Sequence, residues 1–293
     1  LDLSKSKIFA ALQGLLADME TRTLLSMFLL ASAQKDLSMC SFRLFGLQKP
    51  KEKEVWSTEV TKEDLKNAVE DEFGVKYSKD WKRLLKAPTD LDGMYSIRKG
   101  VKVIANYAFR FCKSLVNINI PKGVTSIGNS AFEKCESLTS IIIPDSVTSI
   151  GYSTFLQCYS LRNINIPNSM TSIEGGAFCG CKHLTSINIP DTVTSIGNHA
   201  FSFCFSLTSI NIPDNVTSIG HFAFSCCVSL TSINIPDNVT SIGNYAFSYC
   251  DSLTSINIPN SVTSIGYNAF EECDRLPSQV KSNIIQRFGK NVF

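Results

Sequence analysis

Two consecutive stretches of the chain, CVSLTSINIPDNVTSIGNYAFSYC from Cys227 to Cys250 and CDSLTSINIPNSVTSIGYNAFEEC from Cys250 to Cys273, are nearly identical. The cysteine that ends one copy begins the next, and the spacing of 23 residues extends toward the N-terminus. The cysteines with this spacing are Cys112, Cys135, Cys158, Cys181, Cys204, Cys227, Cys250 and Cys273. The phenylalanines are Phe109, Phe132, Phe155, Phe178, Phe201, Phe224, Phe247 and Phe270. A fixed period of this size is typical of a solenoid, in which each unit buries its apolar face only against its neighbours.

Each unit contains two short extended segments and one tight turn. In SLTSINIP, the spacing of Leu and the two Ile predicts a strand with these side chains pointing inward, and Pro ends the strand because it cannot donate to a ladder. In VTSIG, Val and Ile point inward again, and Gly forms a bend. In AFxxC, the spacing of Phe and Cys predicts one tight helical turn. Stacked coils would align like residues in columns about 4.8 Å apart.

The composition limits the classes of function. Apolar residues make up 44% of the 293 residues and charged residues 18%, as in a globular protein, and the net charge is +2. This charge favours neither nucleic acid nor an anionic membrane as a partner. Eleven cysteines are present, but no C-x-x-C pair, so the spacing does not predict a zinc site. The column spacing permits disulfides between adjacent coils, but parallel side chains stack instead of facing one another, so we expect free, buried thiols.

The repeated pattern L-x-x-I-x-I-P-x-x-V-T-S-I-G-x-x-A-F-x-x-C resembles the leucine-rich repeat of the BspA-like family, found in surface proteins of host-associated bacteria and in some protists. The resemblance covers about Phe73–Leu276. It implies a right-handed leucine-rich-repeat solenoid, with adhesion or protein binding as the function, although fold does not determine function. Departures from the pattern are Ala105 and Glu174 at the bend glycine, Met170 at the valine, and Ile142 at a strand asparagine. We expect them to be small adjustments of the core or the bend.

The chain divides into four segments. Residues 92–276 are predicted to form the solenoid of eight 23-residue units, mainly short β-strands with short helical turns. Residues 49–91 are predicted to form an N-terminal cap of a helix plus a β-hairpin; Thr61 begins the helix and Gly74 ends it. Residues 277–293 are predicted to form a C-terminal capping helix. Both caps would cover the exposed ends of the ladder, which any solenoid requires.

Residues 1–48 permit two interpretations. The stretch 19–33 resembles a secretory signal, with an apolar run and an A-x-A-like site at Ala31-Ser32-Ala33. The alternative is a helical hairpin. The apolar run from Thr23 to Gln34 is too short to span a bilayer, so we expect no transmembrane segment. The signal interpretation and the family resemblance favour a secreted or cell-surface protein, and the hairpin interpretation favours a cytoplasmic one.

The sequence predicts a protein without catalytic activity. None of the three histidines has an assignable triad partner, and no phosphate-binding loop or carboxylate pair stands out. We therefore expect no catalytic, cofactor-binding or metal-binding residue. The predicted function is protein binding or adhesion by a monomer, with a host or cell-surface protein as partner. The alternatives are a structural spacer with no specific ligand and, more remotely, an ice- or surface-binding Thr/Ser array.

Residues that vary between units form the candidate binding surfaces. One set, which we call the aromatic edge, gathers rings on neighbouring units, as protein interfaces do. It consists of His199, Phe203, Phe205, His221, Phe222, Tyr245 and Tyr249. A second set lies on the predicted concave strand face and consists of Asn165, Asn188, Asn211, Asn234 and Asn257. The alternative for the first set is packing along the edge of the solenoid, and for the second a solvated sheet face with side-chain ladders.

Overall fold

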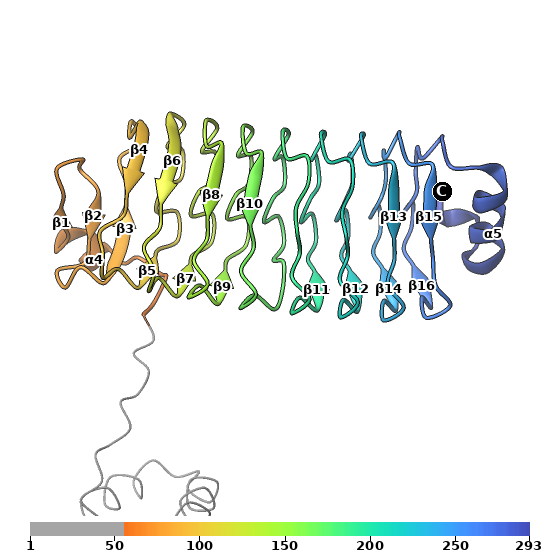
Figure 1. The fold of residues 1–293 in the computed structure, drawn as a ribbon, viewed down its shortest axis with the longest axis horizontal. Helices are drawn as coiled ribbons and strands as arrows, with labels where there is room; N and C mark the ends of the chain where they lie inside the picture. Colours follow the sequence, from red (N-terminus) through yellow and green to blue (C-terminus); the bar gives the residue numbers. More distant parts are fainter. Residues whose placement is uncertain (1–55) are drawn as a thin grey trace, which may run out of the picture. The chain divides into compact units, whose positions relative to one another are not determined.

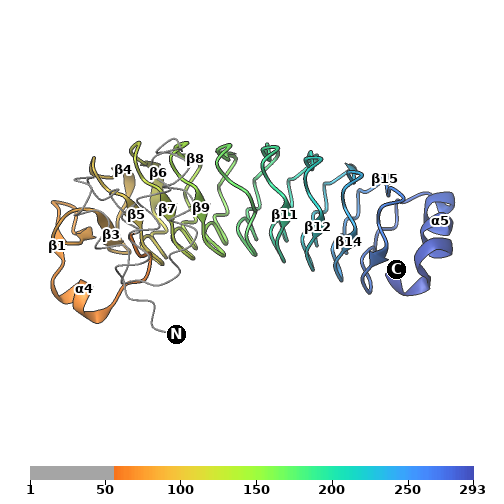
Figure 2. The same ribbon diagram turned by 90° about the horizontal axis from the view of Figure 1, so that it is seen from below.

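The computed structural model describes residues 56–293, and the predicted signal or hairpin segment lies outside these residues. From Trp56 onward the chain winds into stacked coils with a short helix at each end (Figures 1 and 2). We number the eight coils by their cysteine, from coil 1 with Cys112 to coil 8 with Cys273. The predicted solenoid is confirmed.

Two rows of parallel strands run along the solenoid, one along the upper and one along the lower side of Figure 1. The lower row is built from the VTSI segments and consists of β5 (Val103–Ile104), β7 (Ser126–Ile127), β9 (Ser149–Ile150), β11 (Ser195–Ile196), β12 (Ser218–Ile219), β14 (Ser241–Ile242) and β16 (Ser264–Ile265). The upper row is built from the LxxIxI segments and consists of β4 (Gly93–Ser96), β6 (Leu115–Asn119), β8 (Ser140–Ile142), β10 (Asn163–Asn165), β13 (Ser232–Asn234) and β15 (Ser255–Asn257). Except at a register shift beside Gly93, paired residues in the two rows are 23 apart, as in Ile118↔Ile141 and Ile242↔Ile265, so each column holds equivalent residues.

The core is a set of buried columns. Neighbouring phenylalanine rings, from Phe109 to Phe270, lie 5.2–5.6 Å apart with interplanar angles of at most 10°. All eight rings are almost completely shielded from solvent. Each ring is covered on both faces by neighbouring coils, so no coil can bury its own apolar side chains alone.

The segment between the bend and the cysteine differs from the predicted helical turn. In coil 1 the backbone makes two four-residue turns, closed by hydrogen bonds from Ala108 N–H to Ala105 O and from Cys112 N–H to Phe109 O. The third residue is Tyr107 in the first turn and Phe111 in the second, and each has a φ near +60°. These are the features of two type II turns in succession. The turns leave other N–H groups free to bond to the next coil: the N–H groups of Phe109 and Phe111 donate to the carbonyl oxygens of Ala131 and Glu133. A helix would use those N–H groups within the coil.

The same pair of left-handed residues recurs in all eight coils. The pairs are Tyr107 and Phe111, Ser130 and Lys134, Ser153 and Gln157, Gly176 and Gly180, His199 and Phe203, Phe222 and Cys226, Tyr245 and Tyr249, and Asn268 and Glu272. Only coil 4 has glycine at both positions, although the φ angles there, +66° and +75°, are like those of the other coils. The turn therefore forms with side chains of very different size and charge, and it requires none.

The bend glycines allow the coils to approach closely. A Cβ on Gly243 would lie 2.5 Å from the backbone N of His221 in the preceding coil, and Gly128, Gly151 and Gly266 are equally confined. Glu174 replaces this glycine in coil 4, and there the lower row is interrupted: β9 has no partner strand in coil 4. Glu174 is thus a larger change than the small adjustment that we expected, because its Cβ prevents the close approach of coils 3 and 4 at the bend.

The N-terminal cap is mostly β-structure. Helix α4 (Lys62–Lys66) begins with a capping box, in which Thr61 Oγ1 accepts from Asp64 N at 3.0 Å. The expected helix up to Gly74 is wrong in extent, because β1 (Val69–Glu70) pairs antiparallel with β2 (Lys76–Tyr77). The hairpin of β2 and β3 (Arg83–Lys86) is present, and β3 then pairs parallel with β5.

The C-terminal cap completes the hydrogen bonding of coil 8. After helix α5 (Ser278–Phe288), the 3₁₀ turn η1 (Lys290–Val292) takes the place of a ninth coil, since Asn268 N–H and Phe270 N–H donate to Asn291 O and Val292 O, both at 2.8 Å. The Arg287 guanidinium donates to the carbonyl oxygens of Ile258 and Pro259. The last coil is therefore not left as an open edge.

Replacing Gly243 by Ala should lower the free energy of unfolding by about 3 kcal/mol, because the added methyl group meets the backbone of the preceding coil and the two coils must separate. Urea denaturation measures the change. Gly175→Ala is the matched control: its Cβ would meet Asn198 O at 3.2 Å, so a loss below about 1 kcal/mol is expected. Equal losses in the two variants would contradict this account of the bend.

Candidate functional site

The column of cysteines is structural. Each ladder thiol is buried, and its Sγ donates to a carbonyl oxygen of the preceding coil at 3.1–3.3 Å. In seven of the eight, that carbonyl belongs to the core phenylalanine; Cys112 uses Pro88 O instead. Burial raises the pKa of the Cys112 thiol to about 12, and burial raises the pKa of Cys135, Cys181 and Cys204 well above the ordinary value. The free, buried thiols expected from the sequence are confirmed.

Within residues 56–293, no three His, Cys, Asp or Glu side chains lie close enough to hold a metal ion. No helix in the same range has the length and apolar character needed to cross a bilayer.

The predicted aromatic edge separates into columns. The first, which we call the bend column, holds the residue two positions after each bend. Here the rings of His199 and Phe222, and of Phe222 and Tyr245, lie parallel at 4.7 Å, and Tyr267 packs edge-on against Tyr245. Burial, and next the charge of His221, lowers the pKa of His199, which favours a neutral imidazole in the stack. Sequence reasoning missed Tyr267, since its position one residue after the bend gave no sign that it closes the stack.

His221 belongs to a different column. In coils 1, 2, 5 and 7 the residue after the bend is an asparagine whose Oδ1 accepts the N–H of the equivalent residue in the next coil, as in Asn198 with His221 N at 2.8 Å. His221 replaces that asparagine in coil 6, and its Nδ1 accepts from Asn244 N at 2.8 Å. One of its ring nitrogens is therefore already used by the fold.

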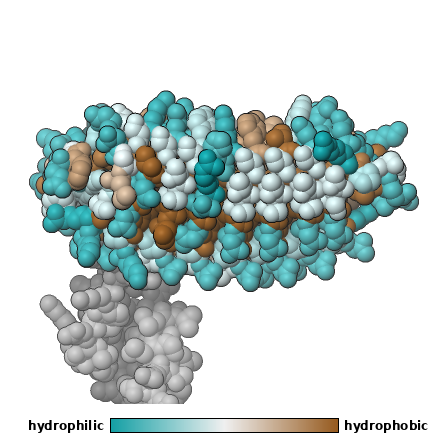
Figure 3. All heavy atoms as spheres, turned by 45° about the horizontal axis from the view of Figure 1, so that its top comes forward, coloured by the Kyte–Doolittle hydropathy of each residue, from teal (hydrophilic) through white to brown (hydrophobic). Residues whose placement is uncertain are grey.

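The second column of rings, which we call the cysteine edge, consists of the residues directly before and after each ladder cysteine. Phe203 and Tyr249 are each 45% exposed and Phe205 is 36% exposed; Phe203 and Phe205 meet edge-on at 6.1 Å. Tyr159 and Lys182, which sequence reasoning missed, extend this patch, because Lys182 Nζ lies 4.3 Å from the Tyr159 ring and 5.9 Å from the Phe205 ring. Figure 3 shows an apolar patch on the upper rim, among polar side chains.

The polar strand face forms the predicted columns. Asn188 bridges to Asn165 and Asn211, and Asn234 pairs with Asn257, so all five asparagines lie in one exposed column. Asn257 Nδ2 donates to Asn234 Oδ1 at 3.2 Å, as expected for a side-chain ladder. Ile142 lies in the same column and is 75% exposed, whereas Asn165 turns its amide to the backbone of Ile143.

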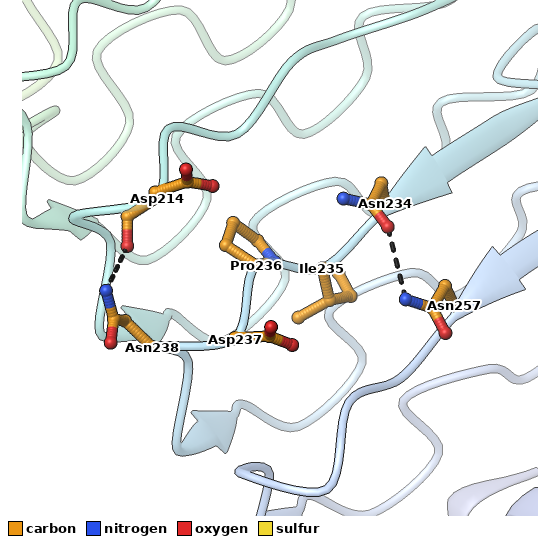
Figure 4. Close-up of a pocket in the computed structure, with 7 residues that line it drawn as sticks. All are labelled: Asp214, Asn234, Ile235, Pro236, Asp237, Asn238 and Asn257. Carbon is orange, nitrogen blue, oxygen red and sulfur yellow. Dashed lines mark hydrogen bonds between the residues drawn. The ribbon is translucent and has the colours of Figure 1, made fainter.

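A shallow hollow beside this column is lined by Asp214, Asn234, Ile235, Pro236, Asp237, Asn238 and Asn257 (Figure 4). Asn238 donates to Asp214 O at 2.7 Å, and the Asn234–Asn257 bond crosses the other side. Several of its polar groups are therefore already paired with one another, as in a solvated face.

A family model described as the BspA type leucine-rich repeat region matches residues 94–204 and 171–293, with six copies. The chain belongs to this family. The chain is similar to a leucine-rich repeat protein from Eubacterium ventriosum whose crystal structure is known, with 28% sequence identity and a TM-score of 0.54. The match covers 71% of this chain and 50% of the Eubacterium ventriosum chain, so this chain spans about half the length of that relative. The leucine-rich repeat protein of T. pallidum is 25% identical with a TM-score of 0.55, covering 78% of this chain and 95% of that one. No curated protein sequence matches the chain.

Native-state alkylation should leave the eight ladder cysteines unmodified, because their thiols are buried and protonated. Treatment with iodoacetamide at pH 8, followed by peptide mass spectrometry, measures the modified fraction of each cysteine. The same treatment in 6 M guanidinium should modify all eleven, because unfolding exposes the thiols. Rapid modification of Cys158 or Cys204 in the folded protein would show that the column is not the core.

Replacing Tyr249 by Gly should leave the free energy of unfolding within about 1 kcal/mol of the wild type. Glycine relieves the strain of the left-handed backbone, which stabilises the folded state by about 1–2 kcal/mol. This gain offsets the loss of the ring contacts and the greater conformational freedom of glycine in the unfolded chain. Phe247→Ala, two residues away in the core column, should cost about 3–5 kcal/mol. Thermal and urea unfolding compare the two variants. A loss of more than 2 kcal/mol in Tyr249→Gly would mean that this ring is part of the core.

Proposed function

We propose that this chain is a protein-recognition module that contacts its partner through the aromatic rings of coils 5–7. The observation that carries the proposal is the run of aromatic residues that coils 5–7 place at the left-handed positions of the turns. His199, Phe203, Phe222, Tyr245 and Tyr249 all have φ between +55° and +60°. This region disfavours residues with a Cβ and is tolerated mostly by Gly, Asn and Asp.

The solenoid does not need rings at these positions. Coil 4 forms the same two turns with Gly176 and Gly180, and coils 2 and 3 use serine, lysine and glutamine. Coil 1 also has rings, Tyr107 and Phe111, but the Arg110 guanidinium lies over both, 5.4 and 4.6 Å from their centroids. The fold requires the left-handed backbone in every coil but an aromatic ring in none, and side chains held at strained positions without a structural need are typical of functional surfaces.

The cysteine edge is the more accessible part of this surface. In the bend column, stacking at 4.7 Å covers the ring faces of Phe222 and leaves ring edges outward. Phe203, Phe205 and Tyr249 are instead exposed by more than a third, and Val228 lies half-buried between them. Exposed aromatic residues of this kind are enriched at protein interfaces. We therefore assign the main contact to the cysteine edge and a supporting role to the bend column.

We also propose that the protein acts at the cell surface or after secretion. The support is membership of the BspA-type family and, within the solenoid, a surface dominated by uncharged Ser, Thr and Asn side chains. Fractionation of the source cells, with an antibody against residues 56–293, tests this placement. Detection in the cytoplasmic fraction alone would contradict it.

Photocrosslinking tests the recognition surface. A benzophenone amino acid placed at position 249 should give adducts with a partner protein in host-cell extract, whereas the same group at position 157 should not. Gln157 is the matched control because it occupies the same left-handed position of coil 3. Adding Phe203→Gly to the position-249 chain should reduce the adducts at least tenfold without lowering the unfolding temperature. Equal adducts from both positions, or adducts unaffected by Phe203→Gly, would contradict the proposal.

A further inference from the structure

The contacts between successive coils are not equal along the solenoid. On the lower row, six of the seven junctions between coils carry the same two backbone hydrogen bonds. The threonine N–H donates to a carbonyl oxygen of the preceding coil, as Thr194 N–H does to Thr171 O at 2.9 Å. The N–H of the bend residue does the same, as Gly197 N–H does to Ile173 O at 2.8 Å. The junction between coils 3 and 4 has neither bond.

This junction is open along the lower row. The N–H groups of Thr171 and Glu174 donate to no acceptor in the described part of the chain. The Thr171 hydroxyl also lacks the bond to the preceding coil that the hydroxyls of Thr148 and Thr194 make at 3.3 and 3.1 Å. In Figure 1 the lower row has no strand between β9 and β11, so strand pairing is absent here too.

The isoleucines beside the opening are less well covered than their equivalents. Ile150 is 6% exposed and Ile173 is 4% exposed, whereas the lower-row isoleucines of coils 1, 2, 5, 6 and 7 are at most 2% exposed. The rings of Phe155 and Phe178 remain stacked at 5.6 Å, so the core column continues across the junction. The opening is therefore confined to one side of the coil.

The other two sides of this junction are fully bonded. On the upper row, β10 pairs with β8 in register. In the turns, Ser153 N–H donates to Gly175 O and Phe155 N–H donates to Ala177 O, both at 2.9 Å. Coils 3 and 4 are therefore joined along two sides and separate along the third.

Glu174 accounts for the separation. At a closed junction the bend glycine lies against the preceding coil, and a Cβ on Gly197 would lie only 2.6 Å from Gly175 N. Glu174 has a Cβ at the equivalent position, so coil 4 cannot approach coil 3 to this distance. Its carboxylate accepts from Ser172 Oγ at 2.6 Å, within its own coil. The lower sides of the two coils therefore stay apart.

We propose that the junction between coils 3 and 4 is a hinge. It divides the solenoid into an N-terminal block, which is the N-terminal cap with coils 1–3, and a C-terminal block, which is coils 4–8 with the C-terminal cap. In a repeat protein each coil is coupled to the rest only through its neighbours, so the junction with the fewest bonds opens first. The bonded upper side and turns keep the blocks attached while the lower side opens and closes.

The hinge lies within the extended ring patch of the cysteine edge. Tyr159 follows the cysteine of coil 3, Lys182 that of coil 4 and Phe205 that of coil 5. Bending at the hinge changes the angle between the Tyr159 and Phe205 rings, so the patch can adjust to the shape of a partner. This consequence for binding rests on the proposed function, but the hinge itself does not.

Hydrogen–deuterium exchange of the full chain, resolved to single amides, tests the opening. After correction for intrinsic rates, the Thr171 amide should exchange about tenfold or more faster than the equivalent Thr194 amide. Glu174→Gly should slow the Thr171 amide by about tenfold, because the coils can then approach and form the missing bonds. Glu174→Ala is the matched control: it removes the carboxylate but keeps the Cβ, so the Thr171 amide should exchange as in the wild type.

Urea unfolding tests the division into two blocks. Both tryptophans of the chain, Trp56 and Trp81, lie in the N-terminal cap, so their fluorescence reports the N-terminal block, whereas circular dichroism reports the whole chain. In the wild type the fluorescence transition should occur at a lower urea concentration than the circular dichroism transition, because the N-terminal block has fewer coils. In Glu174→Gly the two transitions should coincide.

Four outcomes overturn the inference. They are equal protection of Thr171 and Thr194 in the wild type, coincident wild-type transitions, no change in Glu174→Gly, or a Glu174→Ala variant that closes the junction as Glu174→Gly does. None of these measurements involves a partner, so the hinge can fail while the proposed function stands. Failure of the photocrosslinking experiment would in turn leave the exchange and unfolding results unchanged.

Discussion

The structure depends on one constraint: each coil can bury its apolar side chains and complete its backbone hydrogen bonds only against the next coil. The phenylalanine rings stack at 5.2–5.6 Å, and each is covered on both faces. The backbone bonds, the threonine hydroxyls and the thiols also reach from one coil to its neighbour. This constraint explains the constant 23-residue period, because an inserted residue would displace every column at once. It also explains the two caps, since the last coil needs Asn291 and Val292 to accept its N–H groups.

The same constraint determines where the chain is free to vary. Inward columns must hold apolar residues of constant size, and the bend must be glycine wherever adjacent coils approach within 3 Å of its missing Cβ. Outward positions of the two type II turns share a positive φ, and their side chains differ in size and charge from coil to coil. Function is therefore expected in these columns, where chemistry changes from coil to coil while geometry does not. Five rings of coils 5–7 lie there, namely His199, Phe203, Phe222, Tyr245 and Tyr249.

The ladder cysteine shows how one residue type can meet two needs. A thiol is small and largely apolar, so it fits a buried corner, and it also donates a weak hydrogen bond. Its acceptor is the carbonyl oxygen of the core phenylalanine in the preceding coil, at 3.1–3.3 Å in seven coils. Alanine would leave that contact unmade, and serine would place a more polar hydroxyl in the core. This pairing gives a physical reason for a cysteine at every return of the repeat.

The sequence by itself determined the solenoid, its period, the inward columns and the burial of the thiols, because periodic spacing reports directly which residues share a column. Only the tertiary structure decided the rest. The two left-handed turns replaced the expected helical turn, since their N–H groups have better partners in the next coil than in their own. The helix after Thr61 ends at Lys66 because Val69 lies in a strand that pairs antiparallel with the strand of Tyr77. His221 lies in the column of asparagines and not in the ring stack, because its Nδ1 accepts a hydrogen bond from the Asn244 N–H of coil 7. Each of these outcomes depends on a partner that lies at a distance in the chain or in a neighbouring coil, and residue spacing alone contains no information about such partners.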